Sequence, residues 1–331
     1  MVSWKTLLAT GLVAFAALAG VGSPGVGSAE AASWPSRPIH WIVPFPPGGG
    51  TDLVARVIAA QLEKVFGQPI VIDNRPGGST VTGTAVLASA DPDGYTIGMV
   101  FDSLAINAVL GVSTSYNPET DFVPIIKLAD VPLVFTVNSQ QVPIKTLPEL
   151  VSYSNSHPNW FTFGSLGPGS PHEIGFLWFK AMSKMDALVV PYKGIGPALQ
   201  DVVAGQVKGM FVGVSVADGY IQQGTLHTLG VTSTHRLPSA PDVPTIAEQG
   251  YPDYDFVTFY GLAAPKGTPP DIVDRLNKEI NRIFQMPEVR AQFEKTGASI
   301  AGGSPQEFGK FLAANFAKFR NIVALTGDKA K

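Results

Sequence analysis

The 331-residue sequence contains no cysteine and little charge, and both shortages narrow the classes of protein to which it can belong. Without cysteine there is no disulfide framework, thiolate metal site, cysteine nucleophile or lipid-modified cysteine. Charged residues make up 15% of the chain, against about 25% in a typical protein. Lysine and arginine number 23 against 26 acidic residues, so the net charge of −3 offers no basic surface for nucleic acid.

Glycine, proline and apolar residues are plentiful. The chain has 35 glycines and 28 prolines spread along its length, and 45% of its residues are apolar. This composition predicts a globular chain with a sizeable core and many turns, and the length suggests two domains.

Residues 1–31 have the organisation of a secretory signal peptide. Lys5 gives a positively charged start, residues 7–21 are an uncharged apolar run, and Ala29-Glu30-Ala31 matches a cleavage site. The alternative is an uncleaved anchor, but glycine and proline between Gly20 and Gly25 interrupt the run before the ~20 apolar residues that a membrane span needs. We therefore expect export to the periplasm with cleavage near Ala31.

Strand and helix patterns alternate in two stretches of the chain. In the first, a strand at 39–43 leads through a loop at 44–50 to a helix from Leu53 that Thr51 or Asp52 would cap. In the second, which begins near residue 139, a strand at 161–163 leads through a loop at 164–170 to a helix ending near 179. Such alternation is typical of sheets with parallel strands and helices on their faces.

These patterns predict an α/β protein of two lobes, each a mixed sheet flanked by helices, with a ligand cleft between them. We assign residues 32–137 and 258–331 to lobe one and residues 138–257 to lobe two. The chain would cross between the lobes over 139–146 and return along a strand at 256–264. Later helices, the first capped by Asp271, would pack on lobe one.

Each lobe places a glycine-rich loop between a strand and the start of a helix. Free backbone N–H groups and the helix dipole attract an anion there, and glycine allows its close approach. Two such loops facing each other across a cleft would hold one anion from both sides as a hinge closes. The alternative interpretation is ordinary turn chemistry.

No enzyme motif is complete. The loop at 164–170 lacks the lysine of a phosphate-binding P-loop, and Gly48-Gly49-Gly50 lacks the third glycine of a dinucleotide-binding motif. His172-Glu173 begins a zinc-protease motif, but Phe176 stands where its second histidine should be. The five histidines lack metal-ligand spacing. We therefore expect no catalytic residue, no metal and no cofactor, although a hydrolase or lyase using the same cleft is an alternative.

A few side chains near the loops are candidates for ligand contact. Ser103 follows the strand at 95–100, and Tyr192 and Lys193 end a strand of lobe two, where Lys193 would offer a cation to a carboxylate. His172 lies in the first turn after the second loop, where hydrogen bonding at the helix start is its alternative role. Asp52 would repel an anion, so it is expected as a cap or as an acceptor from a bound water, hydroxyl or amine.

Several motifs together resemble one known family. They are WPSRPI at 34–39, VPFPPGGGTD at 43–52, NRPGG at 74–78, DGYT at 93–96, SLGPGSPH at 165–172, PYKG at 191–194, RLPSAPDVPTIAE at 236–248 and GLAAPKGTP at 261–269. This combination is similar to the tripartite tricarboxylate transporter substrate-binding family, called Bug proteins in Bordetella, and the resemblance covers essentially all of the chain after the signal peptide.

The resemblance implies a type II periplasmic solute-binding fold that binds small carboxylates and passes them to a two-subunit membrane permease, or reports them to a sensor domain. We expect a monomer. The positions that match the family's ligand-binding loops are Phe45, Gly49, Gly50, Thr51 and Asp52 in lobe one, and Ser165, Gly167, Gly169, Ser170, His172 and Tyr192 in lobe two.

Two departures from the family pattern bear on the ligand. Gly213 stands where many relatives carry an acidic residue, which argues against an amino-acid ligand because an amine would lose its partner. Phe259-Tyr260 stands where a tryptophan is common. With Phe45, Phe259 and Tyr260 near the cleft, we favour an aromatic or otherwise apolar-bodied carboxylate.

Overall fold

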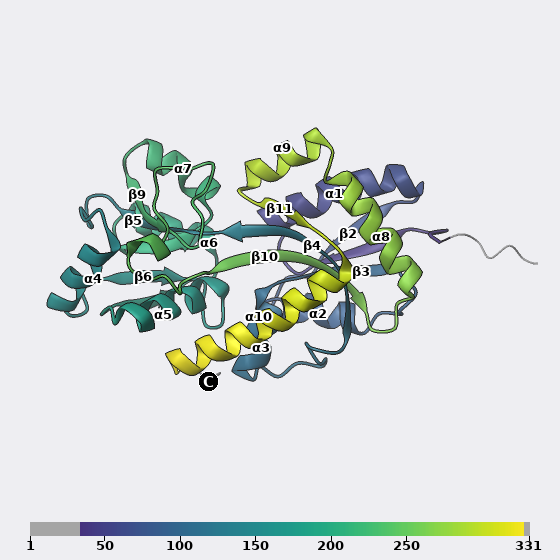
Figure 1. The fold of residues 1–331 in the computed structure, drawn as a ribbon, viewed down its shortest axis with the longest axis horizontal. Coiled ribbons are helices and arrows are strands. Elements are labelled where there is room, and N and C mark those ends of the chain that lie inside the picture. The colour runs from purple at the N-terminus through teal and green to yellow at the C-terminus, as the bar shows by residue number, and fades with distance from the viewer. Residues whose placement is uncertain (1–33, 328–331) are drawn as a thin grey trace, which may run out of the picture. The chain divides into compact units, whose positions relative to one another are not determined.

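The computed structural model describes residues 34–327, so the predicted signal peptide lies outside the described residues. These residues form an α/β fold with two mixed sheets flanked by helices, as the sequence predicted (Figure 1). The first sheet has the order β11-β4-β10-β3-β1-β2, built from β1 (Ile39–Val43), β2 (Ile70–Asn74), β3 (Thr96–Val100), β4 (Phe122–Pro132), β10 (Val257–Pro265) and β11 (Ser299–Gly302). The second has the order β7-β6-β8-β5-β9, built from β5 (Val134–Asn138), β6 (Thr162–Ser165), β7 (Leu188–Pro191), β8 (Gly209–Val212) and β9 (Leu226–Val231).

Parallel strands form the part of each sheet that leads to a glycine loop. Strand β1 pairs in parallel with β2 and β3, and β6 pairs in parallel with β7 and β8. The carboxyl ends of these strands lead into helices α1 (Gly50–Phe66), α2 (Val81–Ala88), α3 (Asp102–Leu110), α5 (Pro171–Ser183), α6 (Ile195–Val203) and α7 (Val214–Gln222). Carboxyl ends of neighbouring parallel strands share one sheet edge, where ligands of open α/β sheets bind.

The first crossing between the sheets lies earlier than the sequence predicted. Strand β5 pairs antiparallel with β8 and β9, so residues 134–138 belong to the second sheet and the chain changes sheets at Leu133. Residues 139–146 lead instead to α4 (Leu147–Ser156). Strand β5 is buried along its whole length, and its mainly apolar residues continue those of β4. The sequence therefore gives no signal that the chain passes from the first sheet to the second at this point.

Thr232, which is fully buried, ties the two crossings together. Its hydroxyl accepts a hydrogen bond from the Leu133 N–H at 2.9 Å and donates one to the Leu133 carbonyl at 3.1 Å. The Thr232 carbonyl accepts from the N–H of Phe256, the residue before β10, at 2.8 Å. One side chain and its backbone therefore hold the departing and returning segments side by side.

The C-terminal helices pack on the first sheet as predicted, and Figure 1 shows α8 and α9 alongside α1. They are α8 (Pro270–Ile283), α9 (Pro287–Thr296) and α10 (Pro305–Thr326), while a short 3₁₀ helix, η1 (Ala247–Gln249), precedes the return crossing. The apolar face of α8 is buried through Ile272, Val273, Leu276, Ile280 and Ile283. Asp271 does not cap α8, because the N-cap is Pro269 and Asp271 lies in the first turn.

Gly261 on strand β10 marks a close approach between the first sheet and α10. A Cβ atom at this position would overlap the ring of Phe308, which is buried on α10. Replacing Gly261 with alanine should therefore lower the free energy of unfolding by about 1–3 kcal/mol, the usual cost of overpacking a core. Urea denaturation measures this difference.

The matched control is Gly219→Ala in helix α7, where an added Cβ meets no atom within 4 Å. Because alanine has less unfolded-state entropy to lose, this change should raise the free energy of unfolding by about 0.5–1 kcal/mol. Equal stability of the Gly261→Ala variant and the wild type would contradict the packing seen here.

Candidate functional site

The loop at 44–49 connects β1 to the start of α1. The helix begins at Gly50 with Gly49 as its N-cap, and no side chain caps it. Thr51 and Asp52 therefore lie inside the first turn and do not cap it, which corrects the sequence prediction. With no side chain as their partner, the N–H groups of this turn are available to an anion. An added Cβ at Gly49 would meet nothing within 4 Å, so this approach is unobstructed.

Asp52 fixes the shape of this loop. Its Oδ2 accepts hydrogen bonds from the Gly48 N–H at 2.9 Å and from Arg56 Nε at 2.8 Å, and its Oδ1 accepts from Asn74 Nδ2 at 3.0 Å. Burial raises the pKa of Asp52, but the hydrogen bonds from Arg56, Gly48 and Asn74 outweigh it and hold the pKa below its ordinary value. Both carboxylate oxygens are thus used within the protein, so Asp52 acts as an anchor for the loop.

Aromatic rings form one wall beside this loop. The exposed ring of Phe45 meets Phe101 edge-on at 4.9 Å between centroids, and Phe101 meets Tyr260 at 5.5 Å. The Tyr260 hydroxyl is hydrogen-bonded to Thr51 and would lie 3.6 Å from a Cβ at Gly50.

Phe259 does not join that wall. Its side chain is 1% exposed and packs on Phe308 and Phe311 of α10, because successive side chains of a strand point to opposite faces. The structure therefore places the predicted Phe259 ring in the core, and Tyr260 is the residue of this pair that reaches the glycine loop.

Ser103 lies in the first turn of α3, three residues after the end of β3. Its buried hydroxyl shares a hydrogen bond of 2.7 Å with the Thr80 hydroxyl. This interaction stabilises the start of α3 against the loop before α2, and it gives Ser103 a partner within the protein.

The second glycine loop follows β6. Ser165 is fully buried and its hydroxyl accepts from the Gly167 N–H at 3.2 Å, while Ser170 caps α5 by accepting from the Glu173 N–H at 3.2 Å. Gly167 and Gly169 have φ angles of +91° and +75°, a conformation that glycine adopts without strain. The serine-glycine pattern found in the sequence is therefore needed for the turn itself.

Both glycine loops lie against the same segment of the first lobe, residues 101–110. The first loop reaches it through Phe45 and Phe101. The second approaches its other end, since a Cβ at Gly169 would lie 3.1 Å from Leu110 and 3.8 Å from Ile106. The two loops therefore contact opposite ends of the same segment of the first lobe.

His172 presents a buried polar atom without a partner beside the second loop. It lies in the first turn of α5, and its Nδ1 is buried and has no hydrogen-bond partner among residues 34–327. Burial lowers the pKa of His172 to about 4, so the imidazole is neutral near pH 7. Buried polar atoms are nearly always hydrogen-bonded, so this nitrogen indicates a place for a water or a ligand atom.

Tyr192 and Lys193 differ in their surroundings. The Tyr192 hydroxyl donates a hydrogen bond of 2.6 Å to Asp201 Oδ2 on α6, and burial together with Asp201 raises the pKa of Tyr192 to about 12. Lys193 is exposed. The Tyr192 hydroxyl is therefore held by Asp201, while Lys193 is accessible to solvent.

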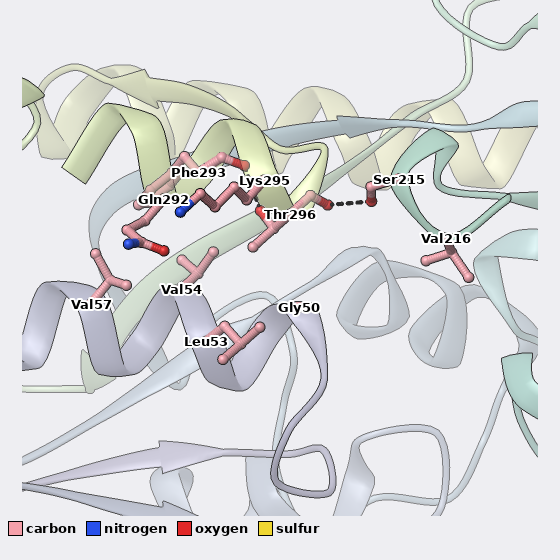
Figure 2. Close-up of a pocket in the computed structure, with 10 residues that line it drawn as sticks. All are labelled: Gly50, Leu53, Val54, Val57, Ser215, Val216, Gln292, Phe293, Lys295 and Thr296. Carbon is pink, nitrogen blue, oxygen red and sulfur yellow. Dashed lines mark hydrogen bonds between the residues drawn. The ribbon is translucent and has the colours of Figure 1, made fainter. Parts of the chain in front are cut away.

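A cavity of about 330 Å³ lies where helices of both lobes meet (Figure 2). It is lined by Gly50, Leu53, Val54 and Val57 of α1, Ser215 and Val216 of α7, and Gln292, Phe293, Lys295 and Thr296 of α9. The Ser215 hydroxyl donates a hydrogen bond of 3.1 Å to the Thr296 carbonyl and so joins the lobes beside it.

Of the residues predicted for the site, only Gly50 lines this cavity. The contributions of α7 and α9 were missed. The sole signal in the sequence was the departure at Gly213, which is the N-cap of α7.

Nowhere between Trp34 and Gly327 do three or more metal-ligating side chains gather around a point that would hold a metal ion. None of the helices over the same range has both the length and the apolar character needed to cross a membrane.

Solved structures of periplasmic binding proteins share this fold. The R. palustris protein Rpa4515 with adipate has a TM-score of 0.81 and 32% sequence identity, and the match covers 89% of this chain and 98% of that one. MatC from Rhodopseudomonas palustris with bound malate has a TM-score of 0.78 and 32% identity, covering 88% and 100% of the two chains. The chain thus has the architecture of a periplasmic binding protein.

The sequence comparison gives the family. The model of the tripartite tricarboxylate transporter family receptor matches residues 54–327, and the chain belongs to this family. The protein BugT of Bordetella pertussis is 35% identical over 319 residues, or 96% of each chain. The resemblance noted in the sequence is therefore confirmed.

Proposed function

We propose that this protein is a periplasmic solute-binding receptor that captures a small carboxylate between its lobes and delivers it to a two-subunit membrane permease. The observation that supports this best is the pair of glycine loops, each leading into a helix N-terminus and each lying against residues 101–110. Helix N-termini attract carboxylates, and two relatives of known structure hold adipate and malate.

The chemistry of capture needs no covalent step. The N–H groups at the start of α1 would bind one side of the carboxylate, and the second loop with the neutral His172 would bind the other. Each N–H to carboxylate hydrogen bond contributes about 1.5–3 kcal/mol net. Three or four of them, after the cost of ordering the ligand, bring the affinity to the micromolar range, about −8 kcal/mol.

A panel of acids tests the capture step. Purified protein is titrated with adipate, malate, citrate, benzoate and glutamate while thermal unfolding is followed, and an acid present at 100 times its dissociation constant should add about 2.7 kcal/mol of stability. The variant Gly50→Ala, which places a methyl group at the start of α1, should raise the dissociation constant of the bound acid about tenfold. The control is Gly219→Ala, whose added Cβ is in free space.

Two outcomes would count against the proposal. The absence of stabilisation by every acid would argue against carboxylate capture. Unchanged uptake of the bound acid by cells that lack the gene would argue against delivery to a permease.

A further inference from the structure

The cavity between α1, α7 and α9 has a chemical character of its own. Its walls are mainly apolar side chains, namely Leu53, Val54, Val57, Val216 and Phe293. Such walls fit a hydrocarbon chain, because burying apolar surface contributes about 25 cal/mol per Å². No aspartate or glutamate is among the lining residues, and Lys295 is the cation.

Lys295 is a charge without a protein counter-ion. It lies in the last turn of α9 and takes part in none of the ion pairs formed within residues 34–327. Figure 2 shows its side chain running along α9 above Val54 toward Gln292, at the wall of the cavity. A carboxylate beside this exposed ammonium would pair with it through a charge-assisted hydrogen bond.

The cavity reaches from this lysine to the first glycine loop. Its floor extends along α1 from Gly50 to Val57, which is about 10 Å at the rise of an α-helix. One extended ligand can therefore touch the N-terminus of α1 at one end and approach Lys295 at the other.

Helix α7 of the second lobe closes the same space. Ser215 donates its hydrogen bond to the Thr296 carbonyl, directly after Lys295 in the chain. The next residue, Gly297, leaves room for this contact, because a Cβ there would lie 3.0 Å from Ser215 Oγ. A ligand in the cavity would thus contact both lobes.

We propose that this cavity holds the distal end of the bound acid and that Lys295 selects ligands that carry a second negative charge on an aliphatic chain. The inference rests on the proposed function and assigns to α9 a part in ligand choice. Lys295 is a specificity-determining residue in this scheme, since the first carboxylate is held at the helix N-termini.

The test compares acids that differ only in the second charge. Calorimetric titrations of adipate against hexanoate and of succinate against butyrate are carried out with the wild type, with Lys295→Gln and with Lys278→Gln. Lys278 is an exposed lysine on α8 that does not line the cavity, so it controls for the loss of one positive charge.

We expect Lys295→Gln to weaken binding of the better diacid about tenfold and to leave its monoacid partner within about twofold, while Lys278→Gln changes neither. Equal effects of Lys295→Gln on both acids, or none, would overturn the assignment. Wild-type binding of monoacids alone would overturn it and leave the proposed function standing, whereas binding of no acid at all would refute the proposed function itself.

Discussion

Replacing Phe135 with alanine is expected to lower the free energy of unfolding by about 3–5 kcal/mol, the usual cost of truncating a buried phenylalanine. Phe135 is fully buried on β5, the strand that follows the first crossing. Its ring meets five others edge-on with centroids 5.1–6.0 Å apart, those of Phe161, Phe163, Phe176, Phe179 and Phe211. Each partner would lose a contact and border a cavity.

Urea denaturation followed by circular dichroism measures the loss. Phe45→Ala is the matched control, because the ring of Phe45 is exposed and its removal leaves no buried cavity. The control should cost less than about 1 kcal/mol. If Phe135→Ala unfolded at the same urea concentration as this control, the ring cluster could not be the centre of the second lobe's core.

The second large effect concerns the buried carboxyl of Asp102. It is 2% exposed and accepts hydrogen bonds of 3.1 Å from Asn315 Nδ2 on α10 and from the Phe259 N–H on β10. Burial raises its pKa from 3.8 to about 6, although Asn315, Phe259 and the nearby Lys318 act in the opposite direction. Asp102 therefore destabilises the fold when it is ionised.

The stability of the fold depends on pH through Asp102. Below pH 3.8 the carboxyl is protonated in both the folded and the unfolded chain, so the full stability is present. As the pH rises toward 6, the unfolded chain releases its proton first, and the free energy of unfolding falls. A rise in pKa from 3.8 to about 6 corresponds to a loss of about 3 kcal/mol above pH 6.

We expect Asp102→Asn to remove this loss. The asparagine oxygen can still accept from Phe259, and the amide of Asn315 can rotate to offer its oxygen. The variant should be more stable than the wild type at pH 7 by up to about 3 kcal/mol and equal to it near pH 4. His172 acts in the opposite direction, because burial lowers its pKa from 6.5 to about 4 and stability falls as the pH falls through that range.

Urea unfolding of both proteins is measured from pH 4 to 8. Because His172 contributes equally to both, its contribution cancels in the difference between their free energies of unfolding. Asp271→Asn, which removes an exposed carboxylate from the first turn of α8, should change the free energy of unfolding by less than about 1 kcal/mol at every pH. If the free energies of unfolding of Asp102→Asn and the wild type changed in parallel with pH, the buried carboxyl could not be the source of the pH dependence.

The elements that the sequence predicted are those with a local pattern. Strand β1 and helix α1 follow from the pattern of apolar residues along residues 39–43 and from Leu53 onward. Helix α3 was missed because residues 102–107 are all buried, so no polar face alternates with an apolar one. Helix α7 was missed for the opposite reason, since only Ala217 is buried.

The candidate site also has a part that local sequence patterns predict and a part that they do not. The two glycine loops could be found because glycine, proline and capping serine act on their immediate neighbours. The bond from Asn74 to Asp52 joins residues 22 apart, and α9 and α7 reach the cavity from distant parts of the chain. Such contacts depend on the order of strands in each sheet, which no local pattern specifies.

Thr232 holds together the two segments that connect the sheets. It binds Leu133 through two hydrogen bonds of its hydroxyl and Phe256 through its carbonyl, so both covalent links between the sheets are clamped at one point. A clamp of this kind resists sliding and stretching more than it resists tilting. In the receptor that we propose, ligand binding would then change the angle between the two lobes. A partner protein could detect this change from the relative orientation of the two lobe surfaces.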